Sequence, residues 1–165
     1  MMSVKAVPNT NYVLEEVNPE NRRIYDIEQA VVLTSPNVFD TGGHENFIRF
    51  IRRGGLPKTY ILNGERGMTS GYIALSILHE QKITEVRSIA VLPRYQSRGY
   101  GGLMMKEAER IAHEAGCGKM TLAANPKNKR ATRFYKNLGY EVVATVDNYF
   151  GDGTPRFIFN KTLPN

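Results

Sequence analysis

The sequence predicts a single α/β domain built around a mixed, mostly antiparallel sheet of six to seven strands, flanked by about four helices. Length is the first indication, because 165 residues correspond to one domain at about 150 residues per domain. The second is the order of apolar patterns: helical spacing early, then a meander of strands, then strand–helix–strand–helix–strand–strand. The third is the lack of a repeat or a Pro/Gly/Ser-rich linker, so the domain is expected to span residues 1–165.

Composition excludes several other classes of protein. With 41% hydrophobic and 23% charged residues and no biased tract, the chain is not disordered, a collagen or a coiled coil. It contains no apolar run of the roughly 18 residues that a membrane span needs, and Met1–Pro8 lacks the apolar core of a signal peptide. Cys117 is the only cysteine, so no disulfide or cysteine zinc cluster forms within the chain. We expect a cytoplasmic protein with no metal and no membrane partner.

The first half of the chain is expected to contain two helices and four strands. A strand at Tyr12–Val17 ends at the Asn18-Pro19 turn signal. Apolar residues at helical spacing predict both helices, and the second ends at Gly54-Gly55. The first helix has Ile24, Ile27, Val31 and Val32 at its apolar positions, with Arg22, Arg23, Glu28 and Gln29 between them, and the second has Phe47, Ile48, Phe50 and Ile51. Runs typical of strands follow at 59–62, 72–78 and 83–92.

The second half is expected to alternate strands and helices before a closing hairpin. A helix over Gly101–Ala115 has its apolar residues at steps of three and four, and Gly116 ends it. Asp152-Gly153 is typical of a hairpin turn. The remaining elements are a strand at 119–123, a helix at 127–138 and hairpin strands at 140–146 and 156–163.

The positive charge of the chain is concentrated in one segment. Between Arg94 and Lys136 there are ten Lys or Arg and three Glu, a balance of +7, against a net charge of +6 for the whole chain. Such a segment forms a solvated surface, or it holds a nucleic acid or a small polyanion. Charge alone does not choose between these.

One stretch between a predicted strand and a predicted helix has the composition of an anion-binding turn. It reads Val-Leu-Pro-Arg-Tyr-Gln-Ser-Arg-Gly-Tyr-Gly-Gly over residues 91–102. Glycines let the backbone approach a ligand closely, and the N–H groups of a first helical turn attract anions. The dinucleotide fingerprint is excluded because Met104 stands where it needs glycine. The phosphate loop of ATPases is excluded because Met120 follows Gly118-Lys119 where it needs Ser or Thr.

The remaining pattern, Gln-x-x-Gly-x-Gly at residues 96–101 after Ile-Ala-Val, resembles the acetyl-coenzyme A site of the GNAT superfamily of N-acetyltransferases. A second signature of that family, Asn-x-x-Ala-x-x-Phe-Tyr-x-x-x-Gly-aromatic, matches residues 128–140. The two signatures stand in the family's order and about 30 residues apart. The resemblance covers roughly Thr84–Leu163, with a coenzyme-binding core at about 83–140.

The resemblance implies where acetyl-CoA binds. Backbone N–H groups of Arg98–Gly102, with the Gln96 side chain, are expected to hold the pyrophosphate. Ile89, Val91 and Asn128 are expected to contact the thioester and the pantetheine arm. The basic segment then has a partner, because coenzyme A is a polyanion. The expected coenzyme-binding residues are Ile89, Val91, Gln96, Arg98, Gly99, Tyr100, Gly101, Gly102, Asn128 and Tyr135.

Three residues are expected to take part in the chemistry. By resemblance, the Tyr135 hydroxyl protonates the leaving thiolate, and the N–H of Ile89 stabilises the carbonyl oxygen. Glu85 is a candidate base or water-holder, because alternation along a strand places it on one side with Arg87, Ile89 and Val91. A charged Glu-x-Arg pair on a strand also fits plain surface, and that reading stays open.

The expected reaction is transfer of the acetyl group of acetyl-CoA to a primary amine of a small molecule, peptide or protein. Arg87 and Tyr149 are candidate contacts to that acceptor. The Asn-Tyr-Phe-Gly-Asp-Gly ending resembles enzymes that acetylate protein N-termini, but those carry a glutamate where Ala123 stands here. A domain that binds acyl-CoA without turnover is the alternative. We expect no nucleic acid partner, and a homodimer stays open because dimers are common in this family.

Overall fold

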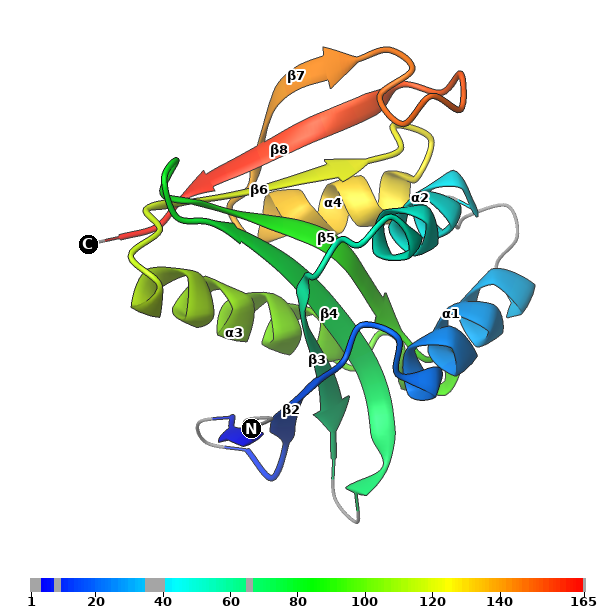
Figure 1. Ribbon diagram of the computed structural model, residues 1–165, viewed down its shortest axis with the longest axis vertical. Coiled ribbons are helices and arrows are strands. Elements are labelled where there is room, and N and C mark those ends of the chain that lie inside the picture. The colour runs from blue at the N-terminus through cyan, green and yellow to red at the C-terminus, as the bar shows by residue number, and fades with distance from the viewer. Residues whose placement is uncertain (1–3, 8–9, 35–40, 65–66, 165) are drawn as a thin grey trace.

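The structure is a computed structural model that describes residues 4–7, 10–34, 41–64 and 67–164. It has an eight-stranded sheet in the order β1-β2-β3-β4-β5-β6-β8-β7 (Figure 1). Neighbouring strands are antiparallel except β5 and β6, which are parallel. The strands are β1 (Val4–Ala6), β2 (Val13–Val17), β3 (Lys58–Asn63), β4 (Thr69–Leu78), β5 (Ile83–Val91), β6 (Lys119–Ala124), β7 (Glu141–Val146) and β8 (Arg156–Thr162).

The predicted fold class is confirmed, although the sheet has one strand more than the six to seven expected. That strand is β1, whose three residues are too few to produce a recognisable alternating pattern. Met1–Ser3 and Pro8, part of the segment considered above for a signal peptide, lie outside the described residues. The helices are α1 (Arg22–Thr34), α2 (Thr41–Arg52), α3 (Tyr100–Glu114) and α4 (Lys129–Asn137), with a 3-10 turn η2 (Pro93–Tyr95) before α3.

Helices cover both faces of the sheet, and each face has its own hydrophobic core. Along β4, Ile73 belongs to the cluster that α3 and α4 complete, whereas Tyr72 belongs to the cluster that α1 and α2 complete. Successive side chains of a strand point to opposite faces, so the two helix pairs lie on opposite sides of the sheet. No helix within the described ranges is both long and apolar enough to cross a membrane.

A β-bulge in β5 changes which of its side chains share a face. Ala74 of β4 pairs with Ser88, and the next residue of β4 pairs with Val86, so Arg87 is the extra residue. Val86 and Ile89 both pack in the α3 core, which strict alternation forbids, and Ala90 packs in the α1/α2 core. The prediction that Glu85, Arg87, Ile89 and Val91 lie on one side is therefore wrong. Glu85 and Arg87 face α2, while Ile89 and Val91 face α3 and α4.

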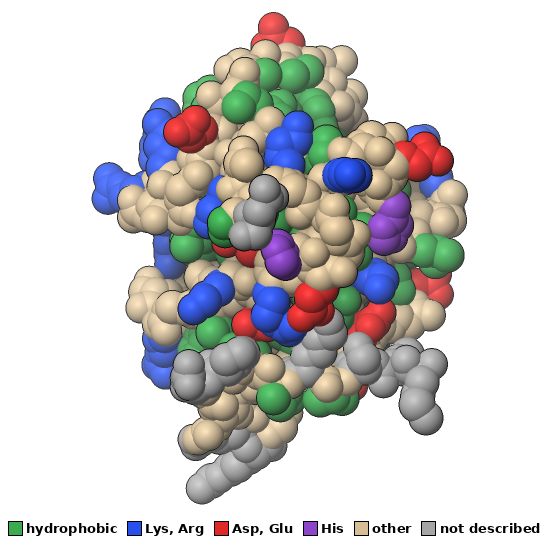
Figure 2. Space-filling view, turned by 90° about the vertical axis from the view of Figure 1, so that its left-hand side faces the viewer, with side chains coloured by type: hydrophobic (Ala, Val, Ile, Leu, Met, Phe, Trp, Pro, Cys, Tyr) green, Lys and Arg blue, Asp and Glu red, His purple; other side chains and the backbone are tan. Residues whose placement is uncertain are grey.

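The two parallel strands separate in the middle of the sheet. Pairing between β5 and β6 runs from Ile83 opposite Lys119 to Val86 opposite Leu122. Beyond Leu122, β6 continues with β8, and β5 continues with β4. The backbone of residues 87–91 on β5 thus faces a widening gap rather than a strand partner. Figure 2 shows the surface on the left-hand side of the molecule in Figure 1, where basic and acidic side chains are intermixed.

Candidate functional site

A cavity of about 520 Å³ lies where β5 and β6 separate. Its wall combines the diverging strands with the turn before α3, the first turn of α3, one face of α4, one residue of α1 and one residue of the β7–β8 loop. The lining residues are Glu28, Val86–Val91, Tyr95–Ser97, Gly99–Gly102, Leu122–Asn125, Asn128, Arg130, Ala131, Phe134, Tyr135 and Phe150. All the expected coenzyme-binding residues except Arg98 are among them. The Arg98 side chain is exposed, outside this wall.

The helix α3 begins at the cavity wall, where Gly99–Gly102 are lining residues. Gly99 is the N-cap of α3 with φ of 86°, and no side chain caps the helix there. Its carbonyl accepts the first helical hydrogen bond, from the N–H of Leu103 at 3.0 Å. The first N–H groups of a helix have no partner within the helix, and the helix dipole adds positive potential at this end. This geometry suits an anion such as a pyrophosphate.

Side chains from two elements hold that turn in place. The Gln96 amide donates to the carbonyl of Val91 at 3.0 Å, which closes the chain back on the end of β5. From α4, the Arg130 guanidinium donates to the Gln96 side-chain oxygen at 3.2 Å and to the Ser97 hydroxyl at 3.0 Å. The Gln96 side chain therefore acts on the turn itself, and its oxygen is already engaged.

The glycine at position 101 leaves room for close packing of α3 against α4. A Cβ on Gly101 would lie 3.2 Å from the ring of Phe134. This contact brings the start of α3 against α4, whose own first turn is capped by Asn128. The Asn128 side-chain oxygen accepts from the N–H of Ala131 at 2.9 Å, so the side-chain donor left for a ligand is its NH₂ group.

Tyr135 lies deep in the cavity wall and is 8% exposed. Its ring contacts those of Phe134, Tyr140 and Phe159, with centroids 5.1, 6.3 and 5.5 Å away. Burial raises the pKa of its hydroxyl to about 12. The phenol therefore keeps its proton throughout the neutral range and is able to donate it.

Glu85 and Arg87 form a charged pair on the α2 side of the bulge. The Arg87 guanidinium lies 3.0 Å from the Glu85 carboxylate, donates to Ser76 at 2.9 Å, and stacks over the Phe50 ring at 4.5 Å. Burial raises the pKa of Glu85, and the charge of Arg87 opposes that shift. A raised pKa makes the carboxylate a better proton acceptor than an exposed one.

Tyr149, a candidate acceptor contact, lies within electrostatic reach of this pair. Burial raises the pKa of Tyr149, the Glu85 carboxylate adds to the shift, and Arg87 reduces it. Of the three residues, only Arg87 lines the cavity described above. Phe150, which follows Tyr149 in the β7–β8 loop, also lines this cavity.

A buried acidic residue, Glu28 of α1, also lines the cavity and is 1% exposed. Its carboxylate accepts hydrogen bonds from the hydroxyls of Tyr72 and Ser88, the latter at 3.2 Å. From its charge, Glu28 is predicted to belong to the polar residues of its helix. Its spacing from Ile24 and Val31, four and three residues away, is that of the apolar face, and this signal identifies it as buried.

Sequence and structure comparisons agree with this geometry. The sequence model of the Acetyltransferase (GNAT) family matches residues 24–140. This match extends over more than half of the chain, which therefore belongs to the GNAT acetyltransferase family.

Individual relatives match shorter stretches. The chain is 37% identical over 79 residues to the uncharacterized N-acetyltransferase CgeE of Bacillus subtilis, an alignment covering 46% of this chain and 30% of the relative. It is 34% identical over 80 residues to the aminoalkylphosphonate N-acetyltransferase of Salmonella typhimurium, covering 48% and 52% respectively. The chain thus spans about half or less of these relatives. A GNAT acetyltransferase from Elizabethkingia anophelis, solved with acetyl-CoA bound, shares the fold with a TM-score of 0.72 and 17% identity, over 93% of this chain and 99% of that one.

Proposed function

We propose that this chain is an N-acetyltransferase that transfers the acetyl group of acetyl-CoA to a primary amine of a small molecule or a peptide. The observation that carries the proposal is the uncapped start of α3, held by Gln96 and Arg130, at a cavity where β5 leaves β6. Family membership and a structural neighbour that binds acetyl-CoA support it.

The lining residues fit acetyl-CoA group by group. N–H groups at Gly99–Gly102 suit the pyrophosphate. The free edge of β5 near Ile89 and Val91 offers backbone groups to an extended amide-containing arm, as a neighbouring strand would. Asn128 offers its NH₂ group to the same arm. Acetyl-CoA would supply an activated acyl group, and Glu85 and Tyr135 would accept and donate the protons.

Acetyl transfer forms a C–N bond and breaks the thioester C–S bond, so the amine loses a proton and the departing sulfur gains one. An alkylamine with a pKa near 10.4 is mostly protonated at neutral pH, and deprotonating it costs roughly 4 kcal/mol. Glu85, with its raised pKa, is the proposed acceptor of that proton, through a water molecule because its side chain does not line the cavity.

Tyr135 is the proposed proton donor to the sulfur. Its buried hydroxyl, whose pKa is raised to about 12, stays protonated throughout the neutral pH range. The N–H of Ile89 is proposed to donate to the thioester carbonyl oxygen, and one such donor is worth about 3 kcal/mol in other enzymes. That group belongs to the backbone, so side-chain substitution at Ile89 does not remove it.

The test combines binding and turnover. Calorimetry measures acetyl-CoA binding, and release of free thiol is followed with a panel of amino acids, polyamines and short peptides. The proposal predicts binding together with thiol release for at least one class of amine. Binding without release from any amine would favour an acyl-CoA sensor, and absence of binding would refute both functions.

A further inference from the structure

A second cavity of about 540 Å³ adjoins the first on the α2 side of the sheet. Arg49, Phe50 and Arg53 line it from α2 and the turn that follows. Arg87 and Phe150 line both cavities, so the two spaces meet at these residues. Whatever occupies the second cavity therefore lies next to the reactive end proposed for the first.

The charge of this second cavity is positive. Its described lining residues include three arginines and no acidic side chain. Arg49 and Arg53 are four residues apart, which places them on one face of a helical turn, and both are exposed and accessible to a ligand. Arg87 adds a third guanidinium from β5, with Glu85 bound at one side of it. An anion entering this cavity would have three arginine side chains in its lining, one of them already paired with Glu85.

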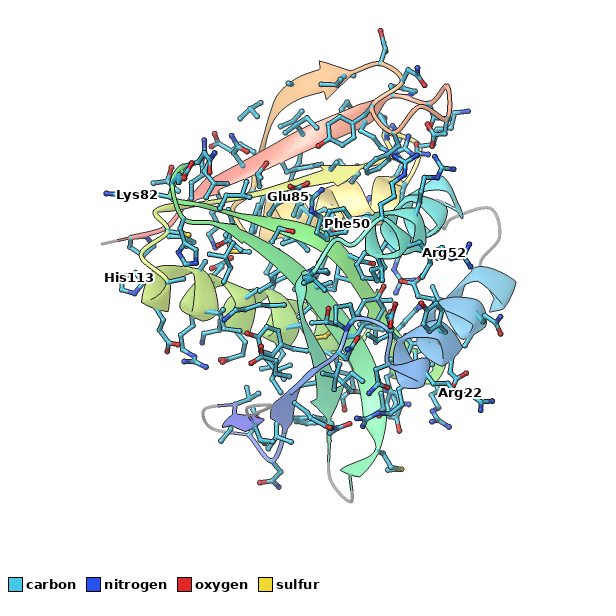
Figure 3. All side chains as sticks on the ribbon, in the orientation of Figure 1. Arg22, Phe50, Arg52, Lys82, Glu85 and His113 are labelled. Carbon is cyan, nitrogen blue, oxygen red and sulfur yellow. The ribbon has the colours of Figure 1, made fainter. Side chains whose placement is uncertain are left out.

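The aromatic side chains give the cavity fixed walls. Phe50 lies under the Arg87 guanidinium at 4.5 Å, and in Figure 3 it points toward the region of Glu85, whereas Arg52 lies away from it. Phe150 packs against Arg156, whose guanidinium lies 5.0 Å from the centroid of its ring. Arg156 is fully buried and is anchored by Asp152 at 2.7 Å. These contacts fix Phe150 between the two cavities.

We propose that the second cavity binds an anionic group of a small amine acceptor, a carboxylate, phosphonate or phosphate, with Arg49, Arg53 and Arg87 as its ligands. The inference rests on the proposed acetyltransferase function and names its substrate class. Guanidinium groups recognise all three anions through charge-assisted hydrogen bonds. The same positive field disfavours a protonated amine nearby, which assists deprotonation of the acceptor and excludes polyamines.

The first test uses acceptors matched in size and different in charge. Thiol release and direct calorimetric binding are measured for phenylalanine, phenylalanine amide and phenethylamine, with an aminoalkylphosphonate and an aminoalkyl phosphate to separate the anion types. Spermidine and a short acidic peptide complete the set. At least one small anionic amine is expected to bind, and its kcat/KM is expected to exceed that of its neutral counterpart by about tenfold or more. Equal values, or preference for the polyamine or the peptide, would overturn the inference.

The second test removes the arginines individually. Arg49→Gln and Arg53→Gln are each expected to lower kcat/KM for the anionic acceptor by about tenfold, with little change for the neutral amide. Arg52→Gln is the matched control, because Arg52 is exposed on the same helix and does not line the cavity. A similar loss in all three variants would contradict a specific site.

Binding measurements keep this inference separate from the proposed function. If acetyl-CoA binds but no thiol is released, calorimetry with the anionic amines still tests the cavity, and absence of binding by every one of them overturns the inference. If anionic amines bind wild type and not the Arg49→Gln/Arg53→Gln double variant, the site stands even where acetyl transfer fails.

Discussion

The two halves of the site are built from different parts of the polypeptide. On the proposed coenzyme side, the groups expected to meet the ligand are mainly backbone N–H groups at the start of α3 and along β5. On the proposed acceptor side, they are side chains: Arg49, Arg53, Arg87 and Phe150. A main-chain site is independent of side-chain identity except where the backbone needs glycine, and a side-chain site changes with every substitution. The acceptor half is therefore expected to be the more sensitive of the two to side-chain substitution.

The difference also explains what each half reveals in the sequence. The coenzyme half is encoded by short contiguous patterns at 96–101 and 128–140. The acceptor half draws on α2, β5 and the β7–β8 loop, which are far apart in the chain. The substitutions below each change one of these halves, and those at Tyr135, Gly99 and Arg130 have a matched control variant outside it.

The largest effect is expected in the coenzyme half, from Tyr135→Phe. Loss of the hydroxyl removes the proposed proton donor, and general acid catalysis contributes about hundredfold or more. We expect kcat to fall by that order, while the Kd of acetyl-CoA stays within about twofold because the ring remains in the wall. Steady-state kinetics and calorimetry measure the two quantities.

Tyr140→Phe is the control for this variant. Tyr140 is also buried, and its hydroxyl donates to Glu109 at 3.1 Å, outside the cavity. Its removal is expected to lower stability and leave kcat unchanged. An unchanged kcat in Tyr135→Phe would remove the acid assignment.

The next effect is expected in the coenzyme half, from Gly99→Val. With φ of 86°, position 99 suits glycine, and a β-branched residue there is strained by about 1–2 kcal/mol. Relief of that strain turns the following N–H groups away from the cavity, so we expect acetyl-CoA to bind at least about tenfold more weakly. Gly116→Val provides the control, because Gly116 has φ of 75° at the other end of α3. Equal weakening of binding in both would show that only stability had changed.

Glu85→Gln is expected to change activity on the acceptor side in a pH-dependent way. Near neutral pH, where the amine is mostly protonated, the rate is expected to fall roughly tenfold, because water replaces a carboxylate as proton acceptor. The deficit shrinks as pH rises toward the pKa of the amine, which then needs no assistance. A pH–rate profile parallel to that of wild type would exclude Glu85 as the base.

The same substitution is expected to change the pH dependence of stability. Burial raises the pKa of Glu85 in the folded state, so the folded protein holds this proton more tightly than the unfolded chain. Below the ordinary pKa of a glutamate, the carboxyl is protonated in both the folded and the unfolded state, and burying it costs no charge. As pH rises through the raised pKa, the folded state must bury a charged carboxylate, and stability is lost. Relative to wild type, Glu85→Gln is therefore expected to lose less stability over that interval, as urea unfolding at several pH values measures.

The smallest effect is expected from Arg130→Gln. Its two hydrogen bonds to the Gln96–Ser97 turn lie at an exposed position, where such contacts contribute little. We expect the Kd of acetyl-CoA to rise about two- to threefold. Arg133→Gln, exposed on the same helix and outside the cavity wall, is expected to leave it unchanged. Identical values for the two variants would mean that Arg130 does not hold the turn.

The sequence predicts the order of elements and, apart from Arg98, a set of residues that line one cavity, because both depend on local patterns of apolar residues, glycines and caps. It fails at the β5 bulge, where one extra residue at Arg87 reverses the faces that alternation predicts. The bulge depends on pairing with β4, which no local pattern encodes. The second cavity is not predicted either, because the segments that line it are far apart in the chain and meet only in the folded structure. Glu28 is different, because its helical spacing from Ile24 and Val31 does predict that it is buried. It is assigned to the polar face only because of its charge.

The central claim is that main-chain N–H groups at the start of α3 hold the pyrophosphate of acetyl-CoA. A crystal structure of the complex with coenzyme A tests it most directly. The expected result is pyrophosphate oxygens within hydrogen-bond distance of N–H groups between Gly99 and Gly102, with the pantetheine arm along β5 toward Tyr135. A pyrophosphate bound elsewhere, with those N–H groups directed at other partners, would contradict the claim.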